Sequence, residues 1–520
     1  MADSNTPEET DYSFHIENDD GVEPNPQDTY VFIVVGATGN FAVNCLLPSL
    51  WLLYKHGYLP PNTTVIGFSR KQFTNKAYAE KVCPYFRHTQ AEKGLIQCFF
   101  SHVIYFRGCC DNRADVQELN TKLEELGRDK IMHLFYHLSL PSQIYKACTQ
   151  LIKEEALSKS GKTRIAIEQP FAQDFTSFRS FRDHVTSSFD PDQIFLQDHY
   201  LGKEMMVSLF SLRFGNIIFE KVWDRSTIAS VLLIIEETSD CSKGNTSDIF
   251  GVIKSDIMTH MMQMIALIAM AKPSKFNTEF IRKAKYKVLS QIPEVELDNV
   301  VLGQYVGNPE GTEEERESYR DHLKIDEDSL TSTFAVVVVF IKNDTWRDVP
   351  FICRCGKAMK DTKQEIRIQF KESPDSLFST KLMRNELVLH YDPGASVCLK
   401  MAMKSPGMEH KLDNVLFSLS YSGRHMSVKL PNSFARLLYE MLCEKRANFV
   451  TFEEINEVFR VFTPVLRVIE EKELEPLPYV RGGKGPIQAA ELINENDYID
   501  REQLLAHKRK QKEKMKMKGM

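Results

Sequence analysis

The segment Gln197–Glu204 holds the densest group of side chains that could do chemistry. Between Asp198 and Lys203 it places a carboxylate, an imidazole, a phenol and an ammonium, and Gly202 gives the backbone freedom to position Lys203. Lys, Tyr and His side chains can donate to a phosphate dianion, and a carboxylate can orient a base that lies elsewhere. The segment therefore suits a phosphorylated substrate with one ionisable reacting group. The alternative is a solvated turn after a strand.

A glycine turn near the start of the chain is typical of a dinucleotide site. The apolar strand Thr29–Val35 leads into this turn, and a helix is expected from Phe41 to about residue 56. Strand, turn and helix N-terminus together place free amide donors where a pyrophosphate can sit. The candidate cofactor-binding residues are Gly36, Thr38, Gly39 and Asn40.

The end of the next strand, Thr63–Arg70, indicates which dinucleotide. An NAD site would place Asp or Glu there to hold the ribose hydroxyls, but Arg70 stands in that position with Lys71 beside it. Cations there favour a 2′-phosphate, so the sequence predicts NADP. A surface arginine after a strand is the alternative.

Strands and helices alternate through the first 200 residues. The pattern predicts further strands at 100–107, 131–140, 164–168 and 193–196, with helices at 74–95, 114–127 and 142–157. This alternation predicts a doubly wound parallel sheet. Segment 197–204 then follows the carboxyl end of the last strand, where such sheets bind ligands.

From about residue 205 the pattern becomes mainly antiparallel. Helices are expected at 204–214, 256–272 and 432–444, and strands at 229–237, 333–342, 365–371, 385–391, 395–402 and 414–420. We expect a disordered acidic arm at 1–28, an NADP-binding Rossmann-type domain at 29–200, a β+α domain at 201–490, and a C-terminal segment with a basic, disordered tail at 491–520.

Bulk properties exclude several function classes. The 520 residues carry a net charge of −6, which argues against a nucleic-acid surface. The eleven cysteines form no metal-binding pattern and fit a reducing compartment. The longest apolar run, Phe334–Ile341, is too short to span a bilayer. Residues 1–28 hold nine acidic side chains and no Lys or Arg, unlike a leader peptide. We expect a cytoplasmic protein without metal, membrane or nucleic acid.

The heptad Asp198–Glu204 resembles the substrate-binding signature of the glucose-6-phosphate dehydrogenases. The resemblance extends from residue 29 to about 490 and includes Val300–Pro309 and Val349–Lys357, whereas Leu196 and Gln197 depart from it. It implies a Rossmann-type domain followed by a β+α domain with a large, mainly antiparallel sheet. It also implies NADP-dependent oxidation of D-glucose 6-phosphate to 6-phospho-D-glucono-1,5-lactone by a homodimer or homotetramer.

The resemblance also assigns roles within the site. A base must take the hydroxyl proton while hydride leaves the same carbon, and such a base typically contributes about 10²–10⁴-fold. This role falls on His260, with Asp198 orienting the imidazole; a core histidine on a Met-rich helix is the alternative. The implied substrate-binding residues are His199, Tyr200, Lys203 and Lys357 for the phosphate and Glu237 for sugar hydroxyls.

Several positions depart from the family pattern. Gln169 stands where the family has a lysine that bonds substrate and cofactor, and losing that contact costs on the order of 1.5–3 kcal/mol. Ser255 replaces a hydroxyl-binding aspartate. Asp256 follows it but would substitute only if the helix register shifted, and it could instead pair with His260. Cys45 removes a cation near the cofactor phosphates.

Some family members carry a second, structural NADP in the β+α domain. The matching residues here are Arg354, Lys363, Arg367, Arg384, Lys400 and Lys484. Lys484 stands in place of an arginine, Cys398 replaces a tyrosine, and the C-terminal tryptophan that stacks on nicotinamide is missing. Clustered cations on a sheet also occur without a ligand, so the sequence leaves this cofactor open.

Two rival functions follow from the departures. Gln169 and Ser255 favour a catalytically impaired paralogue that binds sugar phosphate or NADP, or assembles with an active subunit. The altered contacts involve hydroxyls while the phosphate contacts remain, so another phosphorylated aldose is a further possible substrate.

Overall fold

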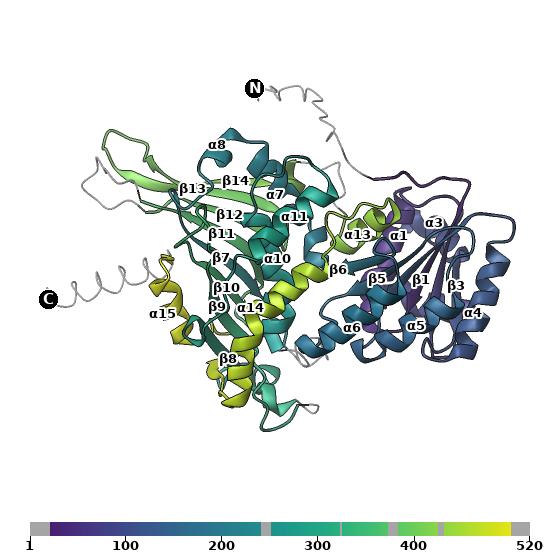
Figure 1. Ribbon diagram of the computed structural model, residues 1–520. Helices are drawn as coiled ribbons and strands as arrows, with labels where there is room; N and C mark the ends of the chain where they lie inside the picture. Colours follow the sequence, from purple (N-terminus) through teal and green to yellow (C-terminus); the bar gives the residue numbers. More distant parts are fainter. Residues whose placement is uncertain (1–20, 241–250, 323–324, 373–382, 425–430, 501–520) are drawn as a thin grey trace.

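The computed structural model describes residues 21–240, 251–322, 325–372, 383–424 and 431–500. The chain forms two sheets, each with its own helices, that lie side by side (Figure 1). The basic tail and residues 1–20 of the predicted acidic arm lie outside the described residues.

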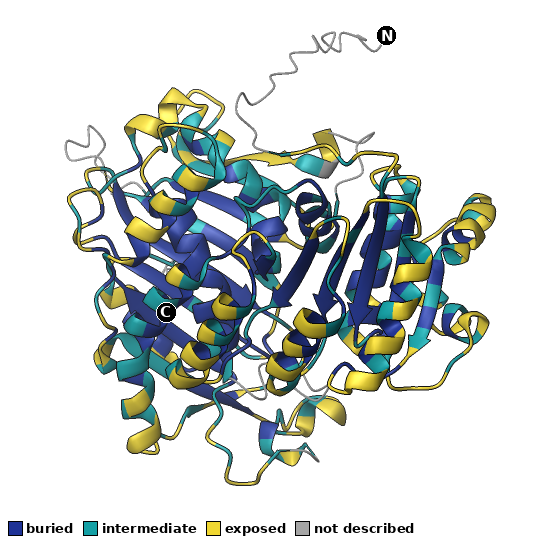
Figure 2. Ribbon diagram, turned by 45° about the vertical axis from the view of Figure 1, so that its right-hand side comes forward, coloured by how far each residue is buried: buried dark blue, intermediate teal, exposed yellow. Residues whose placement is uncertain are grey.

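The first sheet has six strands in the order β3-β2-β1-β4-β5-β6, all paired in parallel. The strands are β1 (Thr29–Val35), β2 (Thr63–Ser69), β3 (Val103–Arg107), β4 (Met132–Leu138), β5 (Thr163–Glu168) and β6 (Ile194–Gln197). This order is the one found in doubly wound dinucleotide-binding sheets, so the predicted Rossmann-type architecture is confirmed. The central strands are buried on both faces (Figure 2).

Helices cover both faces of this sheet. They are α1 (Leu47–Lys55), α2 (Asn75–Val82), α3 (Lys93–Ser101), α4 (Arg113–Leu126), α5 (Tyr145–Glu155) and α6 (Phe175–Ser188), with a π-helix, η1 (Ala42–Leu46), before α1. The single helix expected at 74–95 is wrong. Pro84 lacks an amide hydrogen, the chain passes through a short 3₁₀ turn at Cys83–Tyr85, and helix resumes only after Thr89. Helix α6 was not expected.

The second sheet has nine strands in the order β14-β13-β12-β11-β7-β10-β9-β8-β15. The strands are β7 (Ile228–Glu236), β8 (Val300–Val306), β9 (Phe334–Val339), β10 (Phe351–Gly356), β11 (Lys363–Phe370), β12 (Glu386–Asp392), β13 (Ser396–Lys404), β14 (Leu412–Ser420) and β15 (Leu477–Val480). Most pairs are antiparallel, but β7–β10 and β8–β15 are parallel. The large, mainly antiparallel sheet is therefore confirmed.

The second half also contains several helices. They are α7 (Glu204–Phe214), α8 (Ile217–Lys221), the π-helix η6 (Ile253–Met261), α10 (Met262–Ala269), α11 (Thr278–Leu289), α12 (Tyr421–Arg424), α13 (Ser433–Leu442), α14 (Phe452–Glu471) and α15 (Ile487–Glu495). Helix α13 returns to the first half and packs on α1, where Leu438 and Met441 share a core with Trp51 (Figure 1). This return fixes the seam between the sheets.

Among the described residues, no helix combines the length and the apolar character needed to cross a bilayer.

Candidate active site

Segment 197–204 turns sharply at the end of β6, on the seam between the halves. Asp198 is 1% exposed, and its Oδ1 accepts a hydrogen bond from the Tyr200 amide at 2.9 Å, which starts the short helix His199–Gly202. A Cβ on Gly202 would lie 2.5 Å from the Ser433 carbonyl oxygen, so α13 can pack here only against glycine. The segment is thus held rigidly, unlike a solvated turn.

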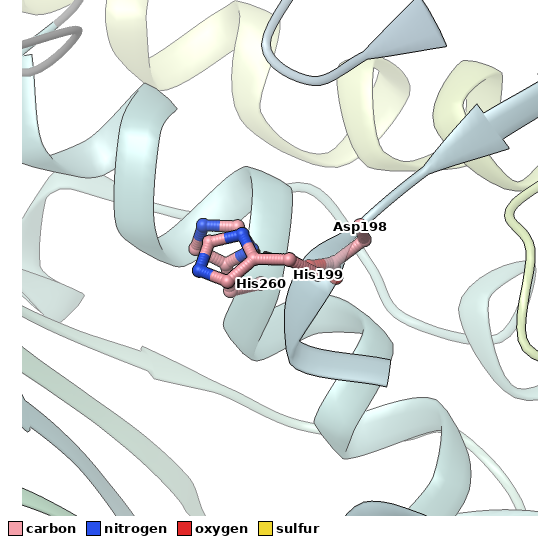
Figure 3. A group of neighbouring side chains, drawn as sticks. All are labelled: Asp198, His199 and His260. Carbon is pink, nitrogen blue, oxygen red and sulfur yellow. Dashed lines mark hydrogen bonds and ion pairs between the residues drawn. The ribbon is translucent and has the colours of Figure 1, made fainter. Parts of the chain in front are cut away.

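His260 reaches Asp198 from the other half of the molecule. Its Nδ1 lies 2.6 Å from Asp198 Oδ1, and both side chains are buried (Figure 3). The Tyr200 ring stacks on the imidazole at 4.1 Å, and the His199 ring lies 4.9 Å away. Because Asp198 engages Nδ1, Nε2 is the nitrogen left for a ligand. Burial strengthens this hydrogen bond and fixes the orientation of the ring.

Asp198, His199 and His260 each offer a ligand atom within 4.8 Å of the others, the spacing of a possible metal site. Asp198 Oδ1 and His260 Nδ1 are already bonded to each other, however. The absence of a metal stays a prediction.

The helix that carries His260 differs from the expected regular helix at 256–272. Residues 253–261 form a π-helix, and only α10 is α-helical. A π-helix winds more slowly than an α-helix, which shifts the direction of successive side chains. Ser255 and Asp256 consequently both line the cavity in front of His260.

One cavity of about 770 Å³ joins the glycine turn to this pair. Its lining includes Gly39, Asn40, Glu168, Gln169, His199, Tyr200, Glu237, Ser255, Asp256, His260 and Lys357. Seven of the nine predicted catalytic and substrate-binding residues line this cavity, and the two exceptions are Asp198 and Lys203. A cofactor at the turn and a substrate at His260 would share this one cavity.

Lys357 lies between two carboxylates. Its Nζ is 3.2 Å from Glu237 Oε2 and 3.5 Å from Asp256 Oδ1. Burial alone would lower the pKa of Lys357, but the charges of Asp256 and Glu237 raise it above its ordinary value, so the ammonium stays charged. Asp256 Oδ2 also accepts from the Ser255 hydroxyl at 2.8 Å. This end of the cavity suits hydroxyl groups.

Asp256 is a candidate ligand-binding residue that the sequence admitted to the site only if the helix register shifted. A one-residue offset in an α-helix points away from its neighbour, and only the π-helix brings it to the wall. The departure at Ser255 was the available signal.

His199 and Tyr200 form the other wall. Burial, with the charges of His260 and Lys203, lowers the pKa of His199 well below its ordinary value, so the ring is neutral near pH 7. Burial raises the pKa of Tyr200 well above its ordinary value, so its hydroxyl keeps its proton. Both can donate one hydrogen bond to an anion without carrying a charge.

Lys203 does not stand where the resemblance implies. Its Nζ is 2.8 Å from Gln364 Oε1 and 2.7 Å from Asp392 Oδ2, and it lies over the Tyr200 ring at 4.6 Å. It is therefore behind Tyr200 rather than on the cavity wall. The acceptor Asp392 on β12, absent from the sequence argument, draws the ammonium away.

Gln169 lies on the cavity wall, and its Nε2 is buried without a hydrogen-bond partner among the described residues. Beside it, burial raises the pKa of Glu168, whose Oε1 is 3.1 Å from His137 Nε2. The same nitrogen lies 3.0 Å from Gln197 Oε1. Gln197 thus belongs to a buried polar network with His137, which nothing in the strand pattern 131–140 indicated.

The glycine turn fits a dinucleotide. Gly36 has φ +86°, and a Cβ there would lie 2.1 Å from the Ser139 carbonyl oxygen, so only glycine is possible. The Thr38 and Ser69 hydroxyls are 2.7 Å apart and hold the turn against the end of β2. Arg70 is exposed just beyond, free to meet a 2′-phosphate. These residues are the ones that would hold the cofactor.

Comparison with known proteins agrees with this architecture. Residues 33–207 match the family model "Glucose-6-phosphate dehydrogenase, NAD binding domain", and residues 210–501 match "Glucose-6-phosphate dehydrogenase, C-terminal domain". The chain is 39% identical over 468 residues to glucose-6-phosphate 1-dehydrogenase 2 of Mus musculus, covering 90% of this chain and 91% of that protein. It is 39% identical over 472 residues to glucose-6-phosphate 1-dehydrogenase of Takifugu rubripes, covering 90% and 89%.

Among solved structures, a glucose-6-phosphate dehydrogenase in complex with its substrate glucose-6-phosphate is similar with a TM-score of 0.85 and 30% sequence identity. The match covers 91% of this chain and 99% of that one.

Proposed function

The chain belongs to the glucose-6-phosphate dehydrogenase family, and we propose that its cavity oxidises D-glucose 6-phosphate with NADP, giving 6-phospho-D-glucono-1,5-lactone, the first oxidative step of the pentose phosphate pathway. The observation that carries this proposal is the 2.6 Å contact between Asp198 and His260 in a cavity that reaches the glycine turn.

The residues divide the reaction between them. His260 Nε2 takes the proton of the sugar's anomeric hydroxyl, and Asp198 holds the ring and stabilises the imidazolium that forms. Bound NADP supplies the nicotinamide ring that accepts the hydride. Tyr200 and His199 donate to the phosphate, and Glu237 bonds the hydroxyls. Lys357, which the resemblance gave to the phosphate, is proposed to bond hydroxyls instead, because its ammonium lies between Glu237 and Asp256. This positions the reacting carbon beside the base.

The test is NADPH formation by the purified full chain, with NADP and NAD in parallel and a panel of hexose and pentose phosphates. We expect turnover with glucose 6-phosphate and a preference for NADP. Turnover only with another aldose phosphate would change the substrate. If folded protein, identified by a cooperative thermal transition, turns over none of these sugars at millimolar concentration, the chain is instead a catalytically impaired paralogue.

Asp256→Asn is expected to lower kcat/KM for glucose 6-phosphate roughly 10- to 150-fold, the value of about 1.5–3 kcal/mol for a lost charge-assisted hydrogen bond. The carboxylate lies on the cavity wall, where Oδ2 accepts from Ser255 at 2.8 Å and Oδ1 is 3.5 Å from Lys357 Nζ. Steady-state kinetics measures the effect. Ser255→Ala, which removes only the donor to Asp256, should cost less, and an equal loss in both variants would contradict a direct contact from Asp256.

Gln169→Lys separates a weakened enzyme from a rebuilt site. Gln169 Nε2 has no hydrogen-bond partner among the described residues. If the site still follows the family arrangement, lysine should raise kcat/KM roughly 10- to 150-fold through a charge-assisted contact. Gln169→Met, of similar length but without charge, serves as the control and should give no gain. Lower activity with lysine would mean that the cavity has adapted to glutamine.

A homodimer or homotetramer is the assembly that we propose, with β14 at the contact. This strand forms one edge of the nine-stranded sheet and exposes Leu416, Phe417 and Leu419. An exposed apolar edge strand attracts another sheet edge unless it is covered. The double substitution Leu416→Glu with Phe417→Glu should therefore yield monomers in light scattering. Ile218→Glu, an exposed apolar residue on α8, should not, and an unchanged oligomer in the first variant would rule out this edge.

We also propose that the protein works in the cytoplasm. The ten cysteines within the described residues are all free, as expected in a reducing compartment.

A further inference from the structure

Four of the six cations that correspond to a second, structural NADP site are already paired with carboxylates of the protein; they are Arg354, Arg367, Arg384 and Lys400. None of the six lines the cavity at His260. Arg367 Nε donates to Glu365 Oε1 at 2.7 Å, and Lys400 on β13 pairs with Glu386 of β12. Arg354 on β10 lies 2.6 Å from Glu236 Oε1 and also donates to the Lys484 carbonyl oxygen at 2.8 Å.

Two buried carboxylates of this group, Glu365 and Glu386, are ionised. Burial would raise the pKa of Glu365, but the hydrogen bond from His390 and the charge of Arg367 lower it to about 2. Burial likewise opposes ionisation of Glu386, yet Arg367 and Lys400 lower its pKa below the ordinary value. Within the described residues, Arg367 and Lys400 therefore each face an ionised carboxylate.

The C-terminal residues after α15 complete the group. Tyr498 is 4% exposed, and its hydroxyl donates to Glu386 Oε1 at 2.8 Å. Arg384 donates to the Asp497 carbonyl oxygen at 2.5 Å and to its Oδ1 at 2.7 Å. Gln369 on β11 binds both backbone groups of Ile499, at 2.8 Å and 3.1 Å. Residues 497–499 are thus bonded to Gln369 of β11, to Glu386 of β12 and to Arg384, which lies just before β12.

These contacts do not fit a second dinucleotide. Its phosphates would add negative charge where four cations, Arg354, Arg367, Arg384 and Lys400, already meet four carboxylates, Glu236, Glu365, Glu386 and Asp497. A buried pair that loses one partner to a ligand leaves an uncompensated charge, which is strongly unfavourable. For a phosphate to bind these cations, residues 497–499 would have to give up their hydrogen bonds to the sheet residues.

We propose that residues 497–499, hereafter the C-terminal clamp, take the place of a structural cofactor in this chain. The clamp ties the end of α15 to the cationic strands of the β+α domain, as a bound dinucleotide phosphate would do between the same cations. The folded state therefore depends on the clamp and is independent of NADP at this place.

Thermal unfolding of the full chain tests the clamp. The double variant Asp497→Gly with Tyr498→Phe removes the side-chain bonds to Arg384 and Glu386, and glycine suits the φ of +56° at residue 497. We expect a Tm lower by about 2–4 °C than that of the wild type, with added NADP giving the same shift in both proteins. Glu495→Gln, an exposed carboxylate on α15, is the control and should leave Tm unchanged.

The number of NADP molecules bound per chain, from equilibrium dialysis, gives a readout separate from activity. One NADP bound per wild-type chain would support the proposal that the clamp replaces a structural cofactor, and two NADP per chain would overturn that proposal. An unchanged Tm in the double variant would also overturn it. If no NADP binds, the proposed oxidation fails while the Tm comparison still decides the clamp.

Discussion

His260→Asn should lower kcat for glucose 6-phosphate by about 10²–10⁴-fold, the usual contribution of a positioned base. Asparagine can still donate an amide hydrogen to Asp198, so the buried carboxylate keeps a partner and the fold is retained. The loss should appear in kcat and only weakly in KM, because the ring accepts the proton in the transition state and does not bind the phosphate.

Steady-state kinetics with thermal unfolding of the same samples checks this result. His410→Asn replaces an exposed histidine outside the cavity and should leave kcat unchanged. A kcat for His260→Asn within threefold of the wild-type value, with an unchanged Tm, would show that His260 is not the catalytic base.

Lys285→Met is expected to destabilise the protein by about 3–5 kcal/mol, the cost of leaving a buried carboxylate without its partner. Lys285 on α11 and Glu454 on α14 are both 0% exposed, with Nζ 3.3 Å from Oε2. Glu454 also accepts from the Thr451 amide at 3.2 Å and so caps α14. The change would weaken the packing of α14 between α11 and α6, where it meets both halves of the molecule.

Chemical denaturation of the variants measures this effect. Adding Glu454→Gln to Lys285→Met should recover part of the loss, because the amide can still cap the helix but carries no unpaired charge. Lys122→Met, which breaks an exposed pair with Glu125, should change stability little. A free energy of unfolding for Lys285→Met equal to the wild-type value would contradict the buried ion pair.

The sequence predicted the first sheet well because its strands are short apolar runs between clear turns. Parallel pairing and the position of segment 197–204 followed from that alternation alone. The nine-stranded sheet was harder to predict from the sequence. Strands β8, β10 and β15 were not expected as strands, since their pairings depend on contacts between distant parts of the chain, such as Leu477 of β15 with Gly303 of β8.

The candidate site was predictable only in part. Asp198 and His260 are 62 residues apart and come together across the seam, which no local pattern can show; the resemblance alone suggested it. The position of Asp256 depended on a π-helix, and that of Lys203 on Asp392 of a distant strand. Neither the shift in register nor the competing ion pair is encoded within a few residues of the side chain concerned.

Hydride transfer from carbon 1 of the sugar to NADP can be followed directly with an isotope label. Wild-type protein would be supplied with NADP and glucose 6-phosphate deuterated at that carbon, and the nicotinamide product analysed by mass spectrometry. We predict one NADPH per sugar oxidised, each carrying the deuterium. Folded protein that binds both ligands but forms no NADPH, or forms NADPH without the label, would contradict it.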